Sequence, residues 1–426
     1  MSAPALTPEQ RAAVECRDRD VLVEAGAGTG KTSTSINRYA RLIEDGLEPS
    51  RILVFTFTEK AATELRERVR RMRAAGGAEF SMSAAWIGTF HSICARILRA
   101  HPIAAGVDPA FAILEDVPAR RLKEAAYEEA LSRVVAEPAG LDAVARFNPA
   151  TLEEGVLGAH EKLRSHGQAR PALPPLPPDR GRPRELAREL AEAAAAALET
   201  PRIRAATKER IEPILAWAAA LPPEREPTFE EVRAIDPGKL SDGLKPLRAA
   251  LDRLLARTAE AAFGDGVRAA LGELLAAYGE AYAERKAAAG ALDFEDLQLA
   301  ALELLRDHPA VAAEYRDQFG EIMVDEFQDT NPLQMELIAA LRGPDTTLFT
   351  VGDEMQAIYG FRHADVELFR ARRDDPAVTV LPLSANFRST APVIGAVNAI
   401  GARVTDGVGA HRSDGATGRD AAGTSH

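Results

Sequence analysis

The stretch that decides the fold is Glu24-Ala25-Gly26-Ala27-Gly28-Thr29-Gly30-Lys31-Thr32. It follows the short apolar run Val21-Leu22-Val23 and leads into the helix-forming segment from Ser33 to Ala40. A buried strand, a glycine-rich turn and a helix, in that order, form the context that a phosphate-binding loop requires. Glycines let backbone N–H groups turn inward around phosphates, and the helix N-terminus also attracts anions. The stretch therefore predicts a nucleotide-binding α/β domain.

Two side chains at the end of this stretch carry its chemistry. Lys31 is placed to reach the β- and γ-phosphates of a nucleotide, and the Thr32 hydroxyl to bind Mg²⁺. Ala25 occupies the position where the phosphate-loop pattern G-x-x-x-x-G-K-[ST] has its first glycine. The alternative is a glycine-rich surface turn. The Gly-Lys-Thr sequence between a strand and a helix favours the phosphate loop.

Composition limits the class of protein. With 426 residues, 46% of them hydrophobic and 27% charged, the chain is long enough for two or more globular units. A net charge of −12 weakens any claim of general affinity for nucleic acid, so a nucleic-acid site would have to be a local patch. The only cysteines, Cys16 and Cys94, cannot form a disulfide framework or a cysteine metal site, which fits a cytoplasmic setting. No secretion signal or membrane-spanning run is present.

A second strand end supplies carboxylates. The segment from Glu321 to Thr330 is an apolar strand that ends in Asp325 and Glu326. Alone, such a pair is usually a solvated turn. Beside a phosphate loop, Asp325 is predicted to hold the Mg²⁺ shell and Glu326 to position or deprotonate the attacking water. Asp325 lies 294 residues after Lys31 (325 − 31), so a large insertion must separate them.

The inserted segment differs from the rest of the chain in its amino-acid composition. From 102 to 290 the chain is helix-prone and rich in Ala, Glu and Arg, and it contains a proline-rich connector at 171–183 that cannot be helix interior. We expect an inserted all-α domain there, within a discontinuous α/β domain at 1–101 and 291–400. The tail 401–426 lacks large apolar residues, so we expect it to be disordered.

Several further segments then complete a resemblance to the UvrD/Rep-type superfamily 1 DNA helicases. It spans Leu6 to Ser389 and rests on ordered motifs, which are LTPEQ, AGAGTGKT, FTFTEKAATEL, GTFHSICARIL, DFEDL, VDEFQDTNPLQ, VGDEMQAIYGFR and ANFRS. The resemblance implies a RecA-like P-loop NTPase parallel sheet (domain 1A) with a large inserted helical domain (1B). ATP and Mg²⁺ are the implied cofactors.

The resemblance also implies residue roles. Gln10 would read the adenine, and Phe387, where the family commonly has Tyr, would stack on it. Gln356 and Arg388 would contact the γ-phosphate region, in addition to catalytic roles for Lys31, Asp325 and Glu326. The implied partners are single-stranded DNA and DNA junctions. Positions that match the family's contacts to single-stranded DNA are Phe57, Thr58, Thr89, His91, Tyr359 and Phe361, the last replacing a frequent Trp.

The resemblance implies that a second RecA-like domain should follow Ser389, where 37 residues remain (426 − 389). That domain would supply an arginine worth roughly 10³–10⁵ in rate. The first hypothesis is ATP hydrolysis coupled to 3′-to-5′ movement on DNA and strand separation. The second is a truncated nucleotide- and DNA-binding fragment with little helicase activity. The third is a nuclease-helicase subunit, which ranks last because no nuclease carboxylate cluster is evident. Pathway, oligomeric state and a frame change near Gly401 stay open.

Overall fold

The computed structural model describes residues 6–74, 84–175, 181–199, 205–222, 225–235, 244–360 and 363–404. The chain divides into two compact units. Unit 1 contains residues 1–122, 160–170 and 283–426, and unit 2 contains residues 123–159 and 171–282. Three of the four boundaries fall within helices, which are α6 (Asp116–Val135), α8 (Pro149–Ser165) and α12 (Lys245–Ala288), and the fourth, between residues 170 and 171, lies in a loop.

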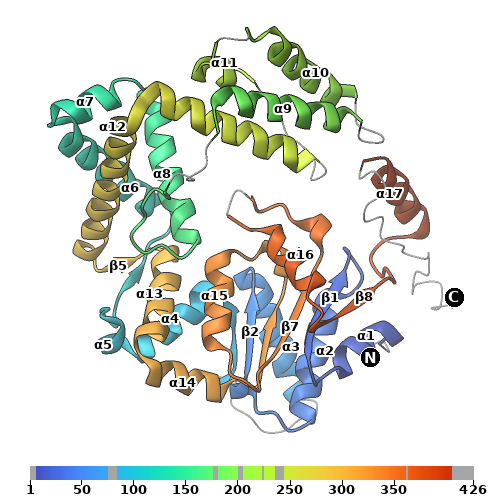
Figure 1. Ribbon diagram of the computed structural model, residues 1–426. Coiled ribbons are helices and arrows are strands. Elements are labelled where there is room, and N and C mark those ends of the chain that lie inside the picture. Colours follow the sequence, from blue (N-terminus) through green and yellow to red (C-terminus); the bar gives the residue numbers. More distant parts are fainter. Residues whose placement is uncertain are drawn as a thin grey trace. The chain divides into compact units, whose positions relative to one another are not determined.

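Unit 1 is built on a parallel sheet (Figure 1). Within the described residues its order is β3-β2-β6-β7-β1-β8, and every neighbouring pair is parallel. The strands are β1 (Asp20–Ala25), β2 (Ile52–Thr56), β3 (Trp86–Thr89), β6 (Glu321–Val324), β7 (Thr347–Gly352) and β8 (Val378–Leu383). The predicted α/β class is confirmed.

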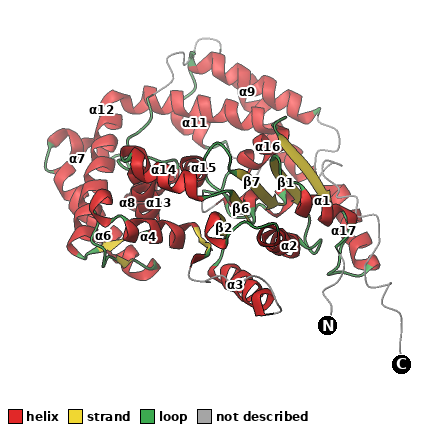
Figure 2. Ribbon diagram, turned by 90° about the horizontal axis from the view of Figure 1, so that it is seen from below, coloured by secondary structure: helices red, strands yellow, loops and turns green. Residues whose placement is uncertain are grey.

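Both faces of this sheet are buried, because successive side chains of a strand point to opposite faces. In β1, Val21 and Val23 belong to one apolar cluster and Leu22 to the other. Figure 2 shows helices on both sides of the sheet. The first cluster includes α2 (Lys31–Glu44) and α3 (Glu59–Ala74), and α1 (Pro8–Glu15) packs against α2. The second cluster includes α4 (Phe90–Ala100), α13 (Phe294–Asp307), α14 (Pro309–Gln318), α15 (Pro332–Leu341) and α16 (Val366–Asp374).

Helix starts in unit 1 follow the expected capping chemistry. Thr7 caps α1, and Pro8 occupies the first helical position. The Thr58 hydroxyl accepts a hydrogen bond from the Ala61 N–H at the start of α3. Asp293 caps α13 in a capping box with Asp296. Local sequence therefore fixes where these helices begin.

A buried ion pair fastens α2 to the sheet. The Arg38 guanidinium donates to a Glu321 carboxylate oxygen at 2.6 Å, and both side chains are almost completely buried. Arg38 also donates to the carbonyls of Ala13 and Cys16 at the end of α1, and it lies over the Phe349 ring. A charge so deeply buried must be paired, so these contacts fix the position of α2 relative to β6 and β7.

Short elements flank the insertion. In unit 1, β4 (Ala112–Ile113) pairs with β5 (Ala291–Leu292), and α5 (Pro102–Ala105) precedes them. Three short 3₁₀ turns are η1 (Pro49–Arg51), η4 (Phe327–Asp329) and η5 (Glu354–Gln356). Two of these, η4 and η5, follow β6 and β7 directly.

Unit 2 is helical throughout its described part, which confirms the predicted helical insert. It contains α7 (Pro138–Val144), α9 (Pro183–Leu198), α10 (Ala205–Ala220), α11 (Phe229–Arg233) and most of α12. Leu190, Ile214 and Leu254 belong to its largest apolar cluster. Gly264 has non-helical dihedrals (φ 72°, ψ 175°) and kinks α12. From the connector predicted at 171–183, Pro183 becomes the first residue of α9, and residues 176–180 lie outside the described residues.

The chain after β8 continues into α17 (Ala391–Val404). The sequence predicts the start of a disordered tail at Gly401, but α17 includes 401–404, because its apolar Val and Ile residues extend the helical pattern. Residues 405–426 lie outside the described residues. In the described part of the chain, no helix has the length and apolar character needed to span a membrane.

Candidate functional site

The parallel sheet brings four loops to one edge, because all its strands point the same way. These loops follow β1, β6, β7 and β8. The loop after β1 contains Gly28 (φ 82°) and Gly30 (φ 93°), both in the left-handed region that side chains rarely adopt. A Cβ on Gly30 would lie 2.6 Å from the Gln10 side-chain nitrogen, and one on Gly28 would lie 2.7 Å from the Arg388 Cβ. Glycine is required at both positions.

Lys31 connects three of the four loops. Its ammonium donates to a Glu326 carboxylate oxygen at 2.7 Å and to the Gln356 side-chain oxygen at 3.2 Å. Lys31 is the first residue of α2, whose N-cap, Gly30, has no side chain with which to cap the helix. The N-terminal N–H groups and the ammonium therefore create positive potential at this edge.

Glu326 has an unusual backbone. Its dihedrals (φ 49°, ψ 48°) are left-handed, which is uncommon for a residue other than glycine and costs about 1–3 kcal/mol. Its carboxylate accepts from Lys31 and, at 3.0 Å, from the Gln328 side-chain amide. Its N–H donates to the Asp325 carboxylate at 3.1 Å. Because of this turn, the adjacent carboxylates of Asp325 and Glu326 line different pockets.

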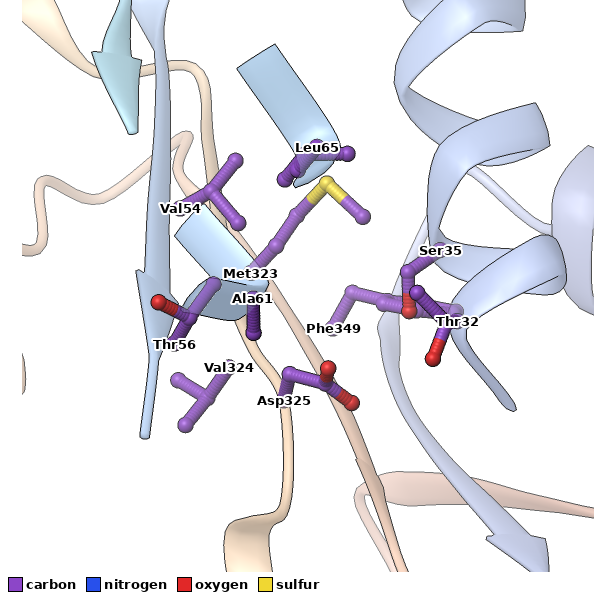
Figure 3. A pocket seen from close by; sticks show the side chains of 10 residues that line it. All are labelled: Thr32, Ser35, Val54, Thr56, Ala61, Leu65, Met323, Val324, Asp325 and Phe349. Carbon is purple, nitrogen blue, oxygen red and sulfur yellow. The ribbon is translucent and has the colours of Figure 1, made fainter. Parts of the chain in front are cut away.

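Asp325 lies at the end of β6, opposite the start of α2. Burial, reinforced by the negative charge of Glu326, raises the pKa of Asp325 to about 6, although Lys31 opposes this shift. Figure 3 shows the Asp325 carboxylate and the Thr32 hydroxyl pointing toward one another across a small pocket of about 10 Å³. Ser35, Thr56 and Phe349 also line that pocket.

A larger pocket, of about 640 Å³, opens beside the loop. Its volume is in the range of ligand-binding pockets. It is lined by Ala27, Gly28, Gly30, Lys31, Thr32, Ser33, Glu64, Arg68, Glu326, Gln356, Phe387 and Arg388. Glu64 and Arg68 on α3 form an ion pair at 2.7 Å and were not among the predicted site residues.

These groups fit a magnesium–nucleotide complex. Mg²⁺ prefers oxygen ligands and usually binds through one or two protein groups plus phosphate oxygens. The Thr32 hydroxyl and the Asp325 carboxylate are such a pair. Among the residues that the structure describes, no three His, Cys, Asp or Glu side chains gather into a metal site, so phosphate oxygens would have to complete the shell.

The residues predicted to bind adenine lie on either side of the glycine loop. The buried Gln10 donates from its side-chain nitrogen to the Thr29 carbonyl at 3.2 Å and accepts from the Thr7 N–H at 3.1 Å. The Phe387 N–H donates to the Gly28 carbonyl at 2.8 Å, and the residue is 40% exposed. Arg388 is exposed and follows it at the rim of the pocket.

Two of the residues predicted to contact DNA meet each other. The rings of Phe57, after β2, and Tyr359, after β7, are 4.7 Å apart between centroids. Thr58 is exposed next to Phe57 and caps α3. Phe361 lies outside the described residues.

The other two DNA-contact candidates lie at the start of α4 and are held by neighbours. The Thr89 hydroxyl donates to a Glu59 carboxylate oxygen at 2.9 Å and caps α4. His91 is 3.1 Å from the Gln298 side-chain nitrogen, and its ring packs on Phe294. The structure thus separates a half-buried aromatic pair from two positions that are held by polar contacts and packing.

Three further polar residues beside the site were not predicted, namely Gln328, Asp329 and Asp353. All are buried. Burial, together with the charge of Glu326, raises the pKa of Asp329 to about 6. The available signal was a run of polar residues directly after two apolar strands, in VDEFQDT and VGDE, where side chains at a strand end are gathered at the edge of the sheet.

Comparison with known proteins agrees with this geometry. The UvrD/REP helicase N-terminal domain family matches residues 6–377. The chain is 30% identical to an ATP-dependent helicase/nuclease subunit of Desulforudis audaxviator, covering 95% of this chain and 40% of that protein. It is 28% identical to the corresponding subunit of Syntrophomonas wolfei, covering 92% and 38%. It is 28% identical to DNA helicase II of Escherichia coli, covering 93% and 40%.

The chain therefore spans about 40% of the length of these relatives. Most of the chain, residues 6–377, lies within the family match. The six-stranded parallel sheet with its helical insert and the phosphate loop facing two carboxylates agree with that match. The chain belongs to the UvrD/REP helicase N-terminal domain family.

Proposed function

We propose that this chain is the ATP-binding part of a DNA helicase or translocase that hydrolyses ATP while it binds single-stranded DNA. The observation that carries the proposal is the Lys31 ammonium, which is held between Glu326 and Gln356 at the mouth of a glycine loop. In this assignment, residues 1–101 and 291–400 make up domain 1A, and residues 102–290 make up the inserted domain 1B.

The site residues would share the work of hydrolysis. Thr32 and Asp325 would hold Mg²⁺, which neutralises phosphate charge when it is bound. Lys31 would exchange its bond to Glu326 for phosphate oxygens, since it is placed at the N-terminus of α2. That exchange would free the Glu326 carboxylate to accept a proton from the attacking water. Gln10 and Phe387 would bind the base, and Gln356 and Arg388 the γ-phosphate region.

DNA would bind at the strand-end aromatic pair Phe57 and Tyr359, near Thr58, Thr89 and His91. Stacking of a base on an aromatic ring is worth roughly 1–3 kcal/mol and tolerates any sequence. Gln356 is three residues before Tyr359, so the γ-phosphate contact and the DNA contact share one short segment. The 3′-to-5′ direction and the use of DNA junctions are proposed from the family resemblance alone.

A second candidate is a nucleotide- and DNA-binding fragment with slow hydrolysis and little unwinding of its own. The chain spans 38–40% of the length of these relatives, so the unwinding that their names describe is tested separately from ATP hydrolysis by this chain. The two candidates are distinguished by the ATPase rate of this chain with and without single-stranded DNA. Rapid turnover that DNA stimulates would support the autonomous motor. Nucleotide and DNA binding without stimulation would support the fragment.

Glu326→Gln tests the catalytic assignment. It removes the proton acceptor but keeps the shape of the side chain, so we expect ATP turnover to fall by about 10²–10⁴. Binding of a non-hydrolysable ATP analogue should be retained. Glu44→Gln, an exposed change near the end of α2, is the matched control and should hydrolyse ATP normally. Unchanged turnover in Glu326→Gln would show that the assignment is wrong.

A further inference from the structure

We propose that Gln328 is a positioning residue, which orients the Glu326 carboxylate and ties it to the η5 segment that contains Gln356. The inference rests on the proposed ATP hydrolysis. Gln328 lies two residues after Glu326, in η4, and only 2% of its surface is exposed.

Every polar atom of the Gln328 side chain has a partner. Its nitrogen donates to Glu326 at 3.0 Å and to the Asp329 carboxylate at 3.1 Å. Its oxygen accepts from the Asp353 N–H at 2.9 Å. A side-chain amide has two N–H donors, so both are used in the directions of the two carboxylates. Gln328 therefore links the loop after β6 to the loop after β7.

The link is one part of a closed ring of hydrogen bonds. From Asp353 the ring continues through the Gln356 side-chain nitrogen, which donates to the Asp353 carboxylate at 2.6 Å. It closes through Lys31, which donates to both Gln356 and Glu326. Buried hydrogen bonds in such a network strengthen one another, and the loss of one member leaves the others unsatisfied.

Gly352 provides independent evidence for this arrangement. A Cβ at Gly352 would lie 2.6 Å from the Gln328 side-chain oxygen and 2.9 Å from the Phe369 ring. Gly352 does not have the positive φ of Gly28 and Gly30. Its lack of a side chain is thus explained by the close approach of β7 to Gln328 and Phe369, not by backbone conformation.

The ring explains why Gln328 should matter for the reaction. Lys31 and Gln328 both hold the Glu326 carboxylate, and Lys31 is the one that would move to phosphate oxygens. Gln328 would then remain as the contact that aims Glu326. A misdirected base slows proton transfer without weakening nucleotide binding. Gln328 is therefore expected to affect kcat more than KM.

Gln328→Met tests this expectation, because methionine has a similar length but no amide. We expect kcat for ATP to fall about 10–100-fold, with KM changed by less than about threefold, as for other residues that orient a reacting group. Gln318→Met is the matched control. Gln318 lies just before the start of β6, at the end of the strand away from the site, and its side-chain amide donates to the Ser50 carbonyl. Its replacement removes an amide of the same kind, and kcat should not change.

Hydrogen exchange gives a readout without nucleotide. In the nucleotide-free protein, the Asp353 amide should exchange at least about tenfold faster in Gln328→Met than in wild type, since it loses its buried acceptor. The exchange rates of the β1 amides should not change in Gln328→Met, and the exchange rate of the Asp353 amide should not change in Gln318→Met. A merely structural defect would accelerate exchange throughout the sheet.

Gly352→Ala is the second variant, because its new methyl group is too close to both the Gln328 side-chain oxygen and the Phe369 ring for either to stay in place. It should reproduce the loss of kcat if Gln328→Met is too unstable to purify. Normal kcat in a folded Gln328→Met or Gly352→Ala, in a wild type that hydrolyses ATP, would overturn the inference. If wild type does not hydrolyse ATP, the proposed function fails. The link between Gln328 and Asp353 is tested independently: if the Asp353 amide exchanges at the same rate in Gln328→Met as in wild type, the link is overturned.

Discussion

Asp329 is a buried carboxylate whose second oxygen has no hydrogen-bond partner among the described residues. Its pKa is about 6 in the folded chain, against an ordinary value of 3.8, because of burial and the nearby Glu326 charge. The folded state therefore binds the proton more tightly than the unfolded state does. The contribution of this carboxyl to stability is therefore fully present below about pH 4 and is lost as pH rises through 6, since the ionised form is the costly one.

Asp329→Asn should remove that cost. Above pH 6, we expect its free energy of unfolding to exceed that of wild type by about 1–3 kcal/mol, and the difference should vanish near pH 4. Urea unfolding at pH 4, 6 and 8 measures this. The substituted amide would keep an oxygen that accepts from Gln328.

Asp345→Asn is the control, because it removes the same charge from an exposed position. It should show no gain that grows with pH. An equal gain in both variants would mean that net charge, and not burial of Asp329, is responsible.

Individual site residues could be predicted where a motif coincides with a strand end. Lys31 ends the glycine loop that follows β1, and Asp325 and Glu326 come directly after β6, so their meeting followed from parallel strands. Gln328 was not foreseen, because its importance depends on where its amide points. That direction is set by the left-handed turn at Glu326, which nothing in the local sequence requires.

Among the elements, α2 is bounded by two glycines with the same backbone angle. Gly30 at its start and Gly46 after its end both have φ 93°. They differ in surroundings. A Cβ on Gly46 would meet nothing within 4 Å, whereas one on Gly30 would lie 2.6 Å from the Gln10 side chain. Substitution of Gly46 therefore measures the cost of the left-handed backbone alone, whereas substitution of Gly30 adds a clash with a neighbouring side chain.

Gly46→Ala should cost about 1–2 kcal/mol of stability, through the left-handed conformation alone, and should leave nucleotide binding intact. Gly30→Ala should lose a similar amount or more and also bind ATP analogues at least about tenfold more weakly, because alanine displaces Gln10 and disturbs the loop. Thermal unfolding and calorimetric titration measure the two effects. Equal nucleotide affinity in both variants would contradict the proposed role of the loop.

Element prediction succeeded where propensity and packing agree. The capped helices α1, α3 and α13 begin after Thr7, Thr58 and Asp293, residue types whose side chains suit a helix N-terminus. The strands β4 and β5 have two residues each, too few for an alternating pattern to be detected. The helix α17 was missed because its glycines, Gly395 and Gly401, lower the helix propensity of the segment that leads into the tail.

At the scale of the whole molecule, the aromatic pair joins segments 302 residues apart (359 − 57). Tyr359→Ala should lower the affinity for single-stranded DNA by about 1–3 kcal/mol, because a stacking surface is lost. Binding of an ATP analogue should be unchanged. Fluorescence anisotropy with labelled oligonucleotides at fixed salt measures the first, and calorimetry the second.

Phe57→Ala should behave in the same way as Tyr359→Ala, and the double variant should lose less than the sum of the two, since the rings contact each other. The control is Phe229→Ala, in α11 of unit 2, which should bind DNA as wild type does. Undiminished DNA affinity in both single variants would rule out this pair as the stacking surface.

The α/β class and the helical insert were predictable, because a phosphate loop and its carboxylates 294 residues apart (325 − 31) leave few alternatives. The extent of each unit was not. The contacts that assign residues 102–122, 160–170 and 283–290 to unit 1 are made between distant segments. One example is the buried group in which Arg164 and Lys286 both bind Asp293 and Asp296, and no local pattern marks such pairing.

The strand order has a consequence during synthesis of the chain. β1 pairs with β7 and β8, and 322 residues separate its end from the start of β7 (347 − 25). At about 5–20 residues per second, a ribosome needs roughly 16–64 s to make them. During that time an apolar strand that carries the phosphate loop has neither of its neighbours. The insertion therefore sets a waiting time in which the nascent chain is open to aggregation or to capture by chaperones.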